Sequence, residues 1–274
     1  MAATTTGDSA SGNGSAPAPT SLHPNLAEAC RAGSLESALG WAQRLAPSPR
    51  DPDNAAAAQQ NGEKPFAWFI DATDGDGRTA FHWAVAQRSF DLAQTLAQEP
   101  YGCDVATRDS NGTTTLLTAI MAQAPTPLVE LILERGIAKH GAYRAAAEWV
   151  NATERSSGNA ALHAAASRNQ RDVAVRLLAA GADPLLRATA TGQTALHKTI
   201  ARNAVELAED LIEHCRKEDP KTARRLVNAQ DNNGDTALHH ASAENNKEFG
   251  EVLLRHHADR AIRNKAGHEF WQVQ

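Results

Sequence analysis

Histidine is the side chain of this sequence with the most obvious potential for acid–base or metal chemistry, because the chain contains eleven of them. A histidine can exchange a proton near neutral pH or bind a metal through a ring nitrogen. Two adjacent pairs occur, His239–His240 and His256–His257. Neighbouring residues of a helix do not face the same way, and neither pair has the i, i+4 spacing of a zinc-binding helix. We therefore interpret the histidines as structural and expect no metal site.

Other catalytic patterns are also missing from the sequence. The cysteines, Cys30, Cys103 and Cys215, are far apart and odd in number, which favours a reducing compartment over a disulfide or zinc framework. No P-loop or dinucleotide-binding glycine pattern is present. The acidic turn at Gly75–Gly77 lacks the rest of a calcium-binding loop. We expect a protein that is not an enzyme and uses no cofactor.

Composition narrows the function further. Of 274 residues, 42% are hydrophobic and 22% charged, so the chain can form a core. Only 5% are aromatic, which indicates a core of Ala and Leu and favours helices. The net charge of −5 does not suit a nucleic-acid-binding protein. No apolar run approaches the roughly 20 residues of a membrane span, so we expect neither nucleic acid nor membrane as a partner.

A repeated segment organises most of the chain. Each copy reads Gly, any residue, usually Thr, a small residue, Leu or Phe, and usually His, and a second apolar helix follows each full copy. Between successive copies of the motif, three of the intervals are close to 33 residues and two are longer. This period together with this motif is typical of the ankyrin repeat. The copies begin at Gly77, Gly112, Gly158, Gly192 and Gly234, with a weaker one at Gly267. We predict an all-α repeat fold, an ankyrin-repeat solenoid of stacked helix pairs with β-hairpin fingers.

The residues of the motif have structural roles in this interpretation. Thr79, Thr194 and Thr236 stand at helix N-caps, where their hydroxyls can accept from exposed backbone N–H groups. The motif glycines allow the preceding turn to take a positive φ. The histidines three residues after the Thr position hydrogen-bond within and between repeats in this motif, and they are His82, His163, His197 and His239.

The domain organisation follows from the repeats. Residues 1–22 are poor in bulky apolar side chains and are predicted to be a disordered tail. The remainder, 23–274, is predicted to be one ankyrin-repeat domain with a cap repeat at 25–45, a disordered insertion at 46–65 and repeats from about 66 to 274. The longer links after Gly136 and His214 contain helix-forming residues, so we expect longer helices or an extra turn there. A capped stack is expected to be a monomer.

The binding surface can be placed from the motif. In an ankyrin stack the hairpin tips and first helices line a concave groove, where charge sets register and association rate. Basic residues are predicted in the middle of the groove and acidic ones towards its C-terminal end. Trp83 and Met121 are candidate anchors, because aromatic residues and Met are enriched in interface cores. The candidate partner-binding residues are Asp74, Asp76, Arg78, Trp83, Met121, Arg168, Lys198, Arg202, Asp235 and Glu244.

Several segments resemble one ankyrin subfamily more closely. These segments are similar to gankyrin-type assembly chaperones of the proteasome regulatory particle. They are the string Arg-Thr-Ala-Phe-His-Trp-Ala at 78–84, the repeat from Gly158 with Ser167, Arg168 and Asn169, and the repeats from Gly192 and Gly234. The likeness covers roughly residues 25–274 apart from the insertions. It departs from that family at Leu117, which replaces the motif histidine.

The resemblance implies a specific partner. Members of that family grip the C-terminal domain of one proteasomal ATPase subunit along the concave face and hinder premature docking of the ATPase ring. Carried over by motif, Arg78 and Arg168 would meet acidic residues, Glu244 would meet basic ones, and Trp83 matches an exposed family Trp. A cytoplasmic and nuclear location is then expected.

Two alternatives remain open at this stage. The first is a generic ankyrin adaptor or scaffold in signalling or transcription, for which Arg78 and Arg168 would be unimportant. The second is the substrate-recognition part of a larger enzyme.

Overall fold

The computed structural model describes residues 23–45, 70–98, 101–140, 148–272. Within these ranges the chain forms helix pairs separated by extended loops. The predicted tail at 1–22 and the predicted insertion at 46–65 lie outside the described residues. The paired helices are α1 (Pro24–Arg31) with α2 (Leu35–Leu45), α5 (Ala80–Ala86) with α6 (Phe90–Ala97), α7 (Thr115–Met121) with α8 (Thr126–His140), α10 (Ala161–Ser167) with α11 (Arg171–Ala179), α12 (Ala195–Ile200) with α13 (Val205–Glu218), and α15 (Ala237–Ala243) with α16 (Lys247–Arg255).

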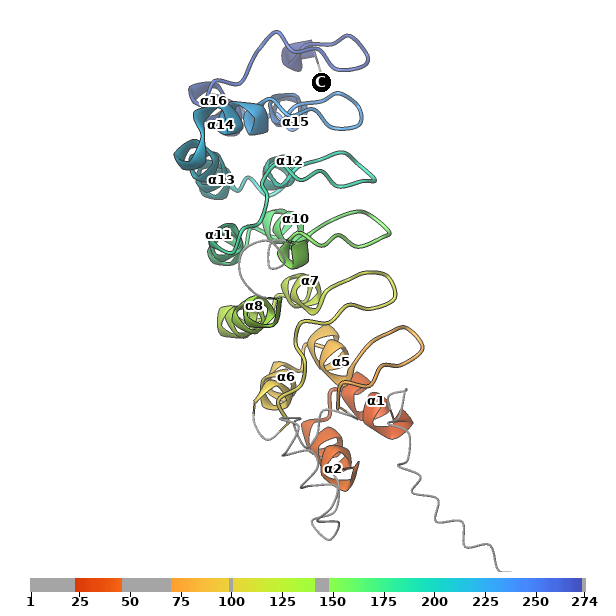
Figure 1. The fold of residues 1–274 in the computed structure, drawn as a ribbon. Helices are drawn as coiled ribbons and strands as arrows, with labels where there is room; N and C mark the ends of the chain where they lie inside the picture. The colour runs from red at the N-terminus through yellow and green to blue at the C-terminus, as the bar shows by residue number, and fades with distance from the viewer. Residues whose placement is uncertain (1–22, 46–69, 99–100, 141–147, 273–274) are drawn as a thin grey trace, which may run out of the picture.

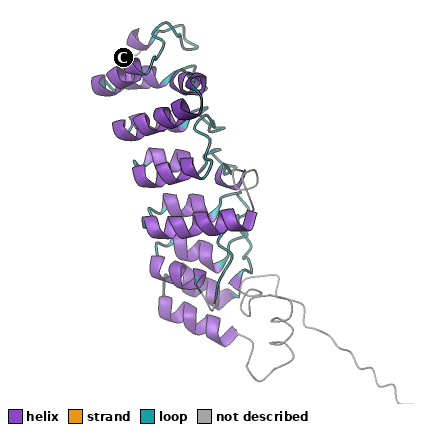
Figure 2. Cartoon of the chain, turned by 60° about the vertical axis from the view of Figure 1, so that its left-hand side comes forward, coloured by secondary structure: helices purple, strands orange, loops and turns teal. Residues whose placement is uncertain are grey.

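The pairs stack in one direction to form an elongated solenoid (Figure 1). The first helices of the pairs form an inner row in which α1, α5, α7, α10, α12 and α15 contact one another in that order. The second helices form an outer row behind them, and a hairpin loop projects from the inner row at each repeat (Figures 1 and 2). The row ends in a short 3-10 helix, η1 (Phe270–Gln272), which packs on α15. The stacking predicted from the repeat motif is therefore confirmed.

Alanine and leucine fill the space between repeats. The core includes Phe81, Leu116, Leu162, Leu196 and Leu238, the apolar residue of each motif copy, all fully or almost fully buried. Small alanines on either side allow neighbouring helices to approach closely. Because every repeat buries its apolar face only against its neighbours, stability comes from stacking. No helix in the described ranges has the length and apolarity needed to span a bilayer.

The hairpin loops differ from the predicted β-hairpins. The described residues contain no strand, and only two isolated bridges occur, Arg108 with Thr114 and Arg263 with Glu269. Consecutive loops are joined instead by single backbone hydrogen bonds at their tips. Ser110 N donates to Asp76 O at 2.8 Å, and later tips repeat the contact from Arg155 to Asn111, Ala190 to Ser157, Asn232 to Thr191 and Lys265 to Asn233. One bond per tip holds the loops in line without forming a sheet.

The motif glycines have the predicted positive φ, and the structure adds a second reason for them. Gly192 and Gly234 have φ of 71° and 80°. A Cβ on Gly234 would lie 2.7 Å from Lys265 N, and one on Gly192 would lie 2.6 Å from Asn232 N. Only glycine therefore allows the next hairpin loop to approach closely enough for the tip hydrogen bond.

Where the structure describes them, the two long links contain helix, and residues 141–147 of the first link lie outside the described residues. α8 continues through Gly136 to His140, and the buried indole of Trp149 lies where a Cβ on Gly136 would be, 2.4 Å away. After α13 the chain forms an additional helix, α14 (Pro220–Val227), which packs against α13. Asp219 caps it by accepting from Lys221 N at 3.1 Å, and Pro220 occupies its first turn.

The turns between paired helices generate a stability prediction. Gln123, between α7 and α8, has φ of 58°, a region that costs an L-residue about 1 kcal/mol. Gln123→Gly is therefore expected to raise the free energy of unfolding by up to about 1 kcal/mol, measured by urea denaturation. Ala122→Gly is the matched control, because Ala122 has φ of −75°. The control should lower stability by about 0.5–1 kcal/mol, and equal effects of both changes would contradict the explanation.

Candidate functional site

Three of the motif histidines, His163, His197 and His239, are buried and connect neighbouring repeats through Nε2. In His163 the Nδ1 atom accepts from Ala160 N at 3.2 Å, at the start of its own helix, and Nε2 bonds to Leu186 O at 3.0 Å in the next hairpin loop. His197 Nε2 bonds to Asp235 O at 3.3 Å and His239 Nε2 to His268 O at 3.2 Å. The histidines thus hold the stack together.

The threonine caps contact the motif histidine as well as the backbone. Thr79 Oγ1 accepts from His82 N at 3.3 Å, as predicted for an N-cap, and also pairs with His82 Nδ1 at 3.0 Å. In Thr194 and Thr236 the hydroxyl likewise pairs with the Nδ1 of the motif histidine, at 2.9 and 2.8 Å. Each cap therefore fixes the histidine ring as well as the start of the helix.

Burial favours the uncharged form of three of the motif histidines, His82, His163 and His197. It lowers the pKa of His82 and of His197 to about 4, and it also lowers the pKa of His163. A neutral ring can accept at Nδ1 while donating at Nε2, which is the pattern that the contacts require.

Aspartates at the hairpin turns are also structural. Asp74, Asp109 and Asp231 each stand three residues before a motif glycine. In each of them Oδ1 accepts two backbone N–H groups from the turn; for Asp74 these are Asp76 N and Arg78 N, both at 3.0 Å. Burial alone would raise the pKa of Asp74, but hydrogen bonds from Arg78, Trp83, Asp76 and Arg31 outweigh it and lower the pKa.

The first predicted anchor, Trp83, lies between two guanidinium groups. Arg31 from α1 and Arg78 stack over its ring, at 4.5 and 4.8 Å from the ring centroid. The indole Nε1 donates to Asp74 Oδ2 at 2.7 Å, and Arg78 Nε donates to Asp109 Oδ2 at 3.4 Å. The structure therefore brings together the predicted residues Asp74, Arg78 and Trp83, and it uses their polar groups inside the chain. Asp76 stays exposed at the loop tip.

The centre of the inner row carries two adjoining hollows, which we call the groove. The first, of about 350 Å³, is lined by residues of α5 and α7 and their loops, including Arg78, His82 and Met121. The second, of about 80 Å³, is lined by residues of α7, α10 and α12, including Arg168 and Lys198. Met121 lines both hollows and is 44% exposed, so it lies at the surface as an interface anchor should.

Three cations at or beside the second hollow have no acidic partner in the described part of the chain. None of the ion pairs found there contains Arg168, Lys198 or Arg202. Arg168 Nη1 donates to Ser167 Oγ at 3.3 Å and Arg202 Nε to Ser167 O at 3.3 Å, which places both guanidinium groups beside one residue. Burial lowers the pKa of the Lys198 ammonium, which a neighbouring carboxylate would oppose. We call Arg168, Lys198 and Arg202 the basic cluster.

The acidic C-terminal end is only partly available. Asp235 Oδ1 accepts from Asn264 Nδ2 at 2.8 Å, whereas Glu244 is exposed at the end of α15. Asp231, Asp235 and His240 place ligand atoms within 4.8 Å of one another, a spacing that a metal ion could use. However, Asp231 Oδ2 already pairs with His240 Nε2 at 3.0 Å, and its Oδ1 with two backbone N–H groups. We therefore interpret the three residues as a hydrogen-bonded group that stabilises the hairpin loop.

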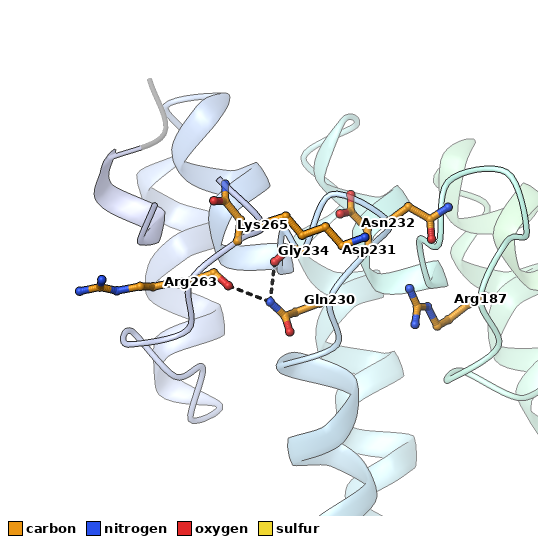
Figure 3. Close-up of a pocket in the computed structure, with 8 residues that line it drawn as sticks. Arg187, Gln230, Asp231, Asn232, Gly234, Arg263 and Lys265 are labelled. Carbon is orange, nitrogen blue, oxygen red and sulfur yellow. Dashed lines mark hydrogen bonds between the residues drawn. The ribbon is translucent and has the colours of Figure 1, made fainter. Parts of the chain in front are cut away.

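A further hollow, of about 480 Å³, lies between the last hairpin loops (Figure 3). Gln230 lines this hollow, and its Nε2 donates to Gly234 O at 2.7 Å and to Arg263 O at 3.0 Å. Arg263 pairs with Glu269, and Arg187 Nε donates to Gly192 O at 2.9 Å. These polar groups bond within their own loop or, in the case of Gln230 and Arg263, to the next loop, so we interpret the hollow as structural.

Two contributions were missed by the sequence interpretation. Arg31 of the predicted cap reaches Trp83 although the two are far apart in sequence, and no motif marks that contact. The aspartates at the turns carried a signal, because each is followed three residues later by the motif glycine. That recurrence indicates a turn-forming role for Asp74.

Comparison with known proteins agrees with this architecture. A family model described as ankyrin repeats in three copies matches residues 162–264. Two solved structures match almost the whole chain: the ankyrin repeat domain of Bcl-3, described as a unique member of the IkappaB protein family (TM-score 0.63, 21% identity, 92% of this chain and 94% of that one), and the human ASB11 ankyrin repeat domain (0.60, 18%, 92% and 91%). The chain folds as an ankyrin-repeat solenoid.

A curated relative matches over a shorter stretch of the solenoid. E3 ubiquitin-protein ligase KEG of Arabidopsis thaliana is 27% identical over 161 residues. The alignment covers 58% of this chain and 9% of that protein, so the match spans less than a tenth of the relative's length.

The buried histidines predict how stability depends on pH. Their folded pKa values lie below the ordinary value of 6.5, so the unfolded chain binds more protons as the pH falls. The stabilisation is complete above pH 6.5 and is lost as the pH falls towards 4. We expect the free energy of unfolding in urea to drop by a few kcal/mol between pH 7 and pH 4.5. A flat profile, or ring signals that titrate near 6.5 in the folded protein, would contradict buried neutral histidines.

Proposed function

We propose that this ankyrin-repeat solenoid is a non-catalytic protein-binding adaptor that holds an acidic surface of its partner in the groove. The observation that carries the proposal is the basic cluster, whose three cations have no carboxylate partner in the described residues and two of which, Arg168 and Lys198, line a hollow with the exposed Met121. Unpaired charges at a surface steer and orient a partner of opposite charge. Met121 supplies the apolar contact that such an interface needs at its centre.

We further propose that the partner is the C-terminal domain of a proteasomal ATPase subunit, bound during assembly of the regulatory particle in the cytoplasm and nucleus. The support is the sequence resemblance at 78–84 and in the repeats from Gly158, Gly192 and Gly234, together with the charge order. A basic centre at Arg168 and Lys198 followed by exposed Glu244 suits a partner with the opposite order.

A second candidate is the recognition part of a ubiquitin ligase. The alignment with E3 ubiquitin-protein ligase KEG favours it, since that relative extends far beyond the matched stretch. In this case the groove would bind a substrate protein, and the catalytic step would belong to another part of the assembly. A partner other than the proteasomal ATPase is then expected.

A binding titration tests the first candidate. The chain is titrated against the isolated ATPase C-terminal domain, in the wild-type form and with Arg168→Glu and Lys198→Glu combined. Charge reversal in the groove should weaken binding by at least about tenfold, and added salt should weaken the wild-type complex. Lys221→Glu with Arg224→Glu is the matched control, because both residues are exposed on α14, outside the groove. The control should bind as the wild type does.

The possible outcomes separate the proposals. Wild-type binding that survives the groove variant would reject the basic cluster as the contact. Absence of wild-type binding, with the folded state verified by circular dichroism, would reject the ATPase as partner. Affinity capture with the same variants then tests the adaptor and ligase candidates, since capture that depends on Arg168 and Lys198 supports the groove itself.

A further inference from the structure

Two arginines of the basic cluster converge on one residue, Ser167. Arg168 and Arg202 follow α10 and α12, the first helices of adjacent repeats, and helices packed side by side have axes about 8–10 Å apart. Arg168 Nη1 donates to Ser167 Oγ and Arg202 Nε to Ser167 O, each at 3.3 Å. Arg202 therefore reaches back across the boundary between repeats, which brings both guanidinium groups within reach of a single ligand group.

Most N–H groups of the basic cluster remain available to a ligand. Each guanidinium uses one nitrogen on Ser167, and its other two nitrogens have no acceptor among the described residues. Lys198 lines the 80 Å³ hollow together with Arg168 and Ser167, and it forms no ion pair within the described ranges. Its side chain is partly buried. A cation that has lost part of its hydration without gaining a counter-ion is stabilised by an anion.

The convergence is a property of two neighbouring repeats. Arg168 and Arg202 each stand ten residues after a motif glycine. The other full repeats have Gln87, Ala122 and Glu244 at this position. The positive charge is thus concentrated at one boundary between repeats, which indicates a site for one compact anion rather than a diffuse basic surface.

The charge of the lining selects among anions. Glu154 is the one carboxylate among the described residues that line this hollow, and its Oε1 accepts from Ser157 Oγ in its own hairpin loop. The three cations of the cluster against this carboxylate leave two positive charges. A carboxylate ligand brings one negative charge and two oxygens, whereas a phosphate monoester brings about −1.5 to −2 at pH 7 and three accepting oxygens. Because arginine forks also match phosphate geometry, phosphate suits both the charge and the donors.

We propose that the basic cluster binds a phosphate monoester of the protein partner, carried by a phosphoserine or phosphothreonine. The proposal deepens the proposed function and rests on it, since the partner must present this group in the groove. The phosphate oxygens accept from Arg168, Lys198 and Arg202, while Met121 contacts the neighbouring part of the partner. Phosphorylation of the partner then strengthens its binding, because the unmodified hydroxyl brings no charge.

The Met121 methyl group gives a selective test on the full chain. Met121 lines the same hollow as Arg168 and Lys198, and the sequence has two methionines, so carbon-13 methyl labelling produces two signals. The probes are blocked Gly-phosphoserine-Gly, Gly-Ser-Gly and Glu-Glu peptides, the last with two carboxylates. The phosphopeptide should shift the Met121 signal in a saturable titration. The Glu-Glu peptide should bind about tenfold more weakly, and the serine peptide should give no shift.

Two pairs of substitutions complete the test. Arg168→Gln with Arg202→Gln removes two cations of the cluster and should abolish the phosphate-dependent shift. Lys221→Gln with Arg224→Gln removes two exposed cations of α14 and should retain it. Circular dichroism verifies folding, and the comparison of peptides on the wild-type chain decides the proposal without the variants. Equal affinity for the Glu-Glu peptide, no shift with the phosphopeptide, or a shift that persists without Arg168 and Arg202 overturns it.

Failure of this proposal and failure of the proposed function are distinguishable, because the probes are short peptides. A phosphopeptide that does not bind, while the ATPase domain still binds through Arg168 and Lys198, rejects the phosphate site and leaves the acidic partner surface. A phosphopeptide that binds, while the ATPase domain does not, supports the phosphate site and rejects that partner.

Discussion

The structure depends on one interaction, the hydrogen bonding of a neutral histidine buried between repeats. Its Nδ1 accepts from the residue that caps its own helix, and its Nε2 donates to a carbonyl of the next hairpin loop, as in His163 and His197. Each ring therefore couples the start of one helix to the position of the next repeat. A charged ring could not accept at Nδ1, so the stack requires that burial keep the histidines unprotonated.

The same requirement shapes the functional face. Hairpin loops held by one tip hydrogen bond and by aspartates such as Asp74 and Asp231 keep a constant spacing along the inner row. Most polar groups in the loops are used by these contacts. The groups left over, the basic cluster and the exposed Met121, are therefore the ones available to a partner.

The sequence predicted where several site residues lie, but not which of their polar groups are already paired with other residues. Repeat positions correctly placed Met121, Arg168 and Lys198 on the inner row, because their register relative to the motif glycine fixes the helix face they occupy. The sequence could not show that Trp83 donates to Asp74 or that Arg78 pairs with Asp109. Nor could it show that Arg31 of the first helix pair reaches both Trp83 and Asp74.

The sequence by itself determined the repeat, the helix pairs, the positive φ of the glycines and the alanine–leucine core, because each of these depends on local propensity and a fixed period. Only the tertiary structure decided which charges pair and which remain free. A charged side chain forms an ion pair only with an opposite charge within about 4 Å of it. In this solenoid that partner often belongs to a neighbouring repeat. The hairpin loops show the same limit: only the tertiary structure shows that consecutive loops share one backbone hydrogen bond at each tip and form no strand in the described residues.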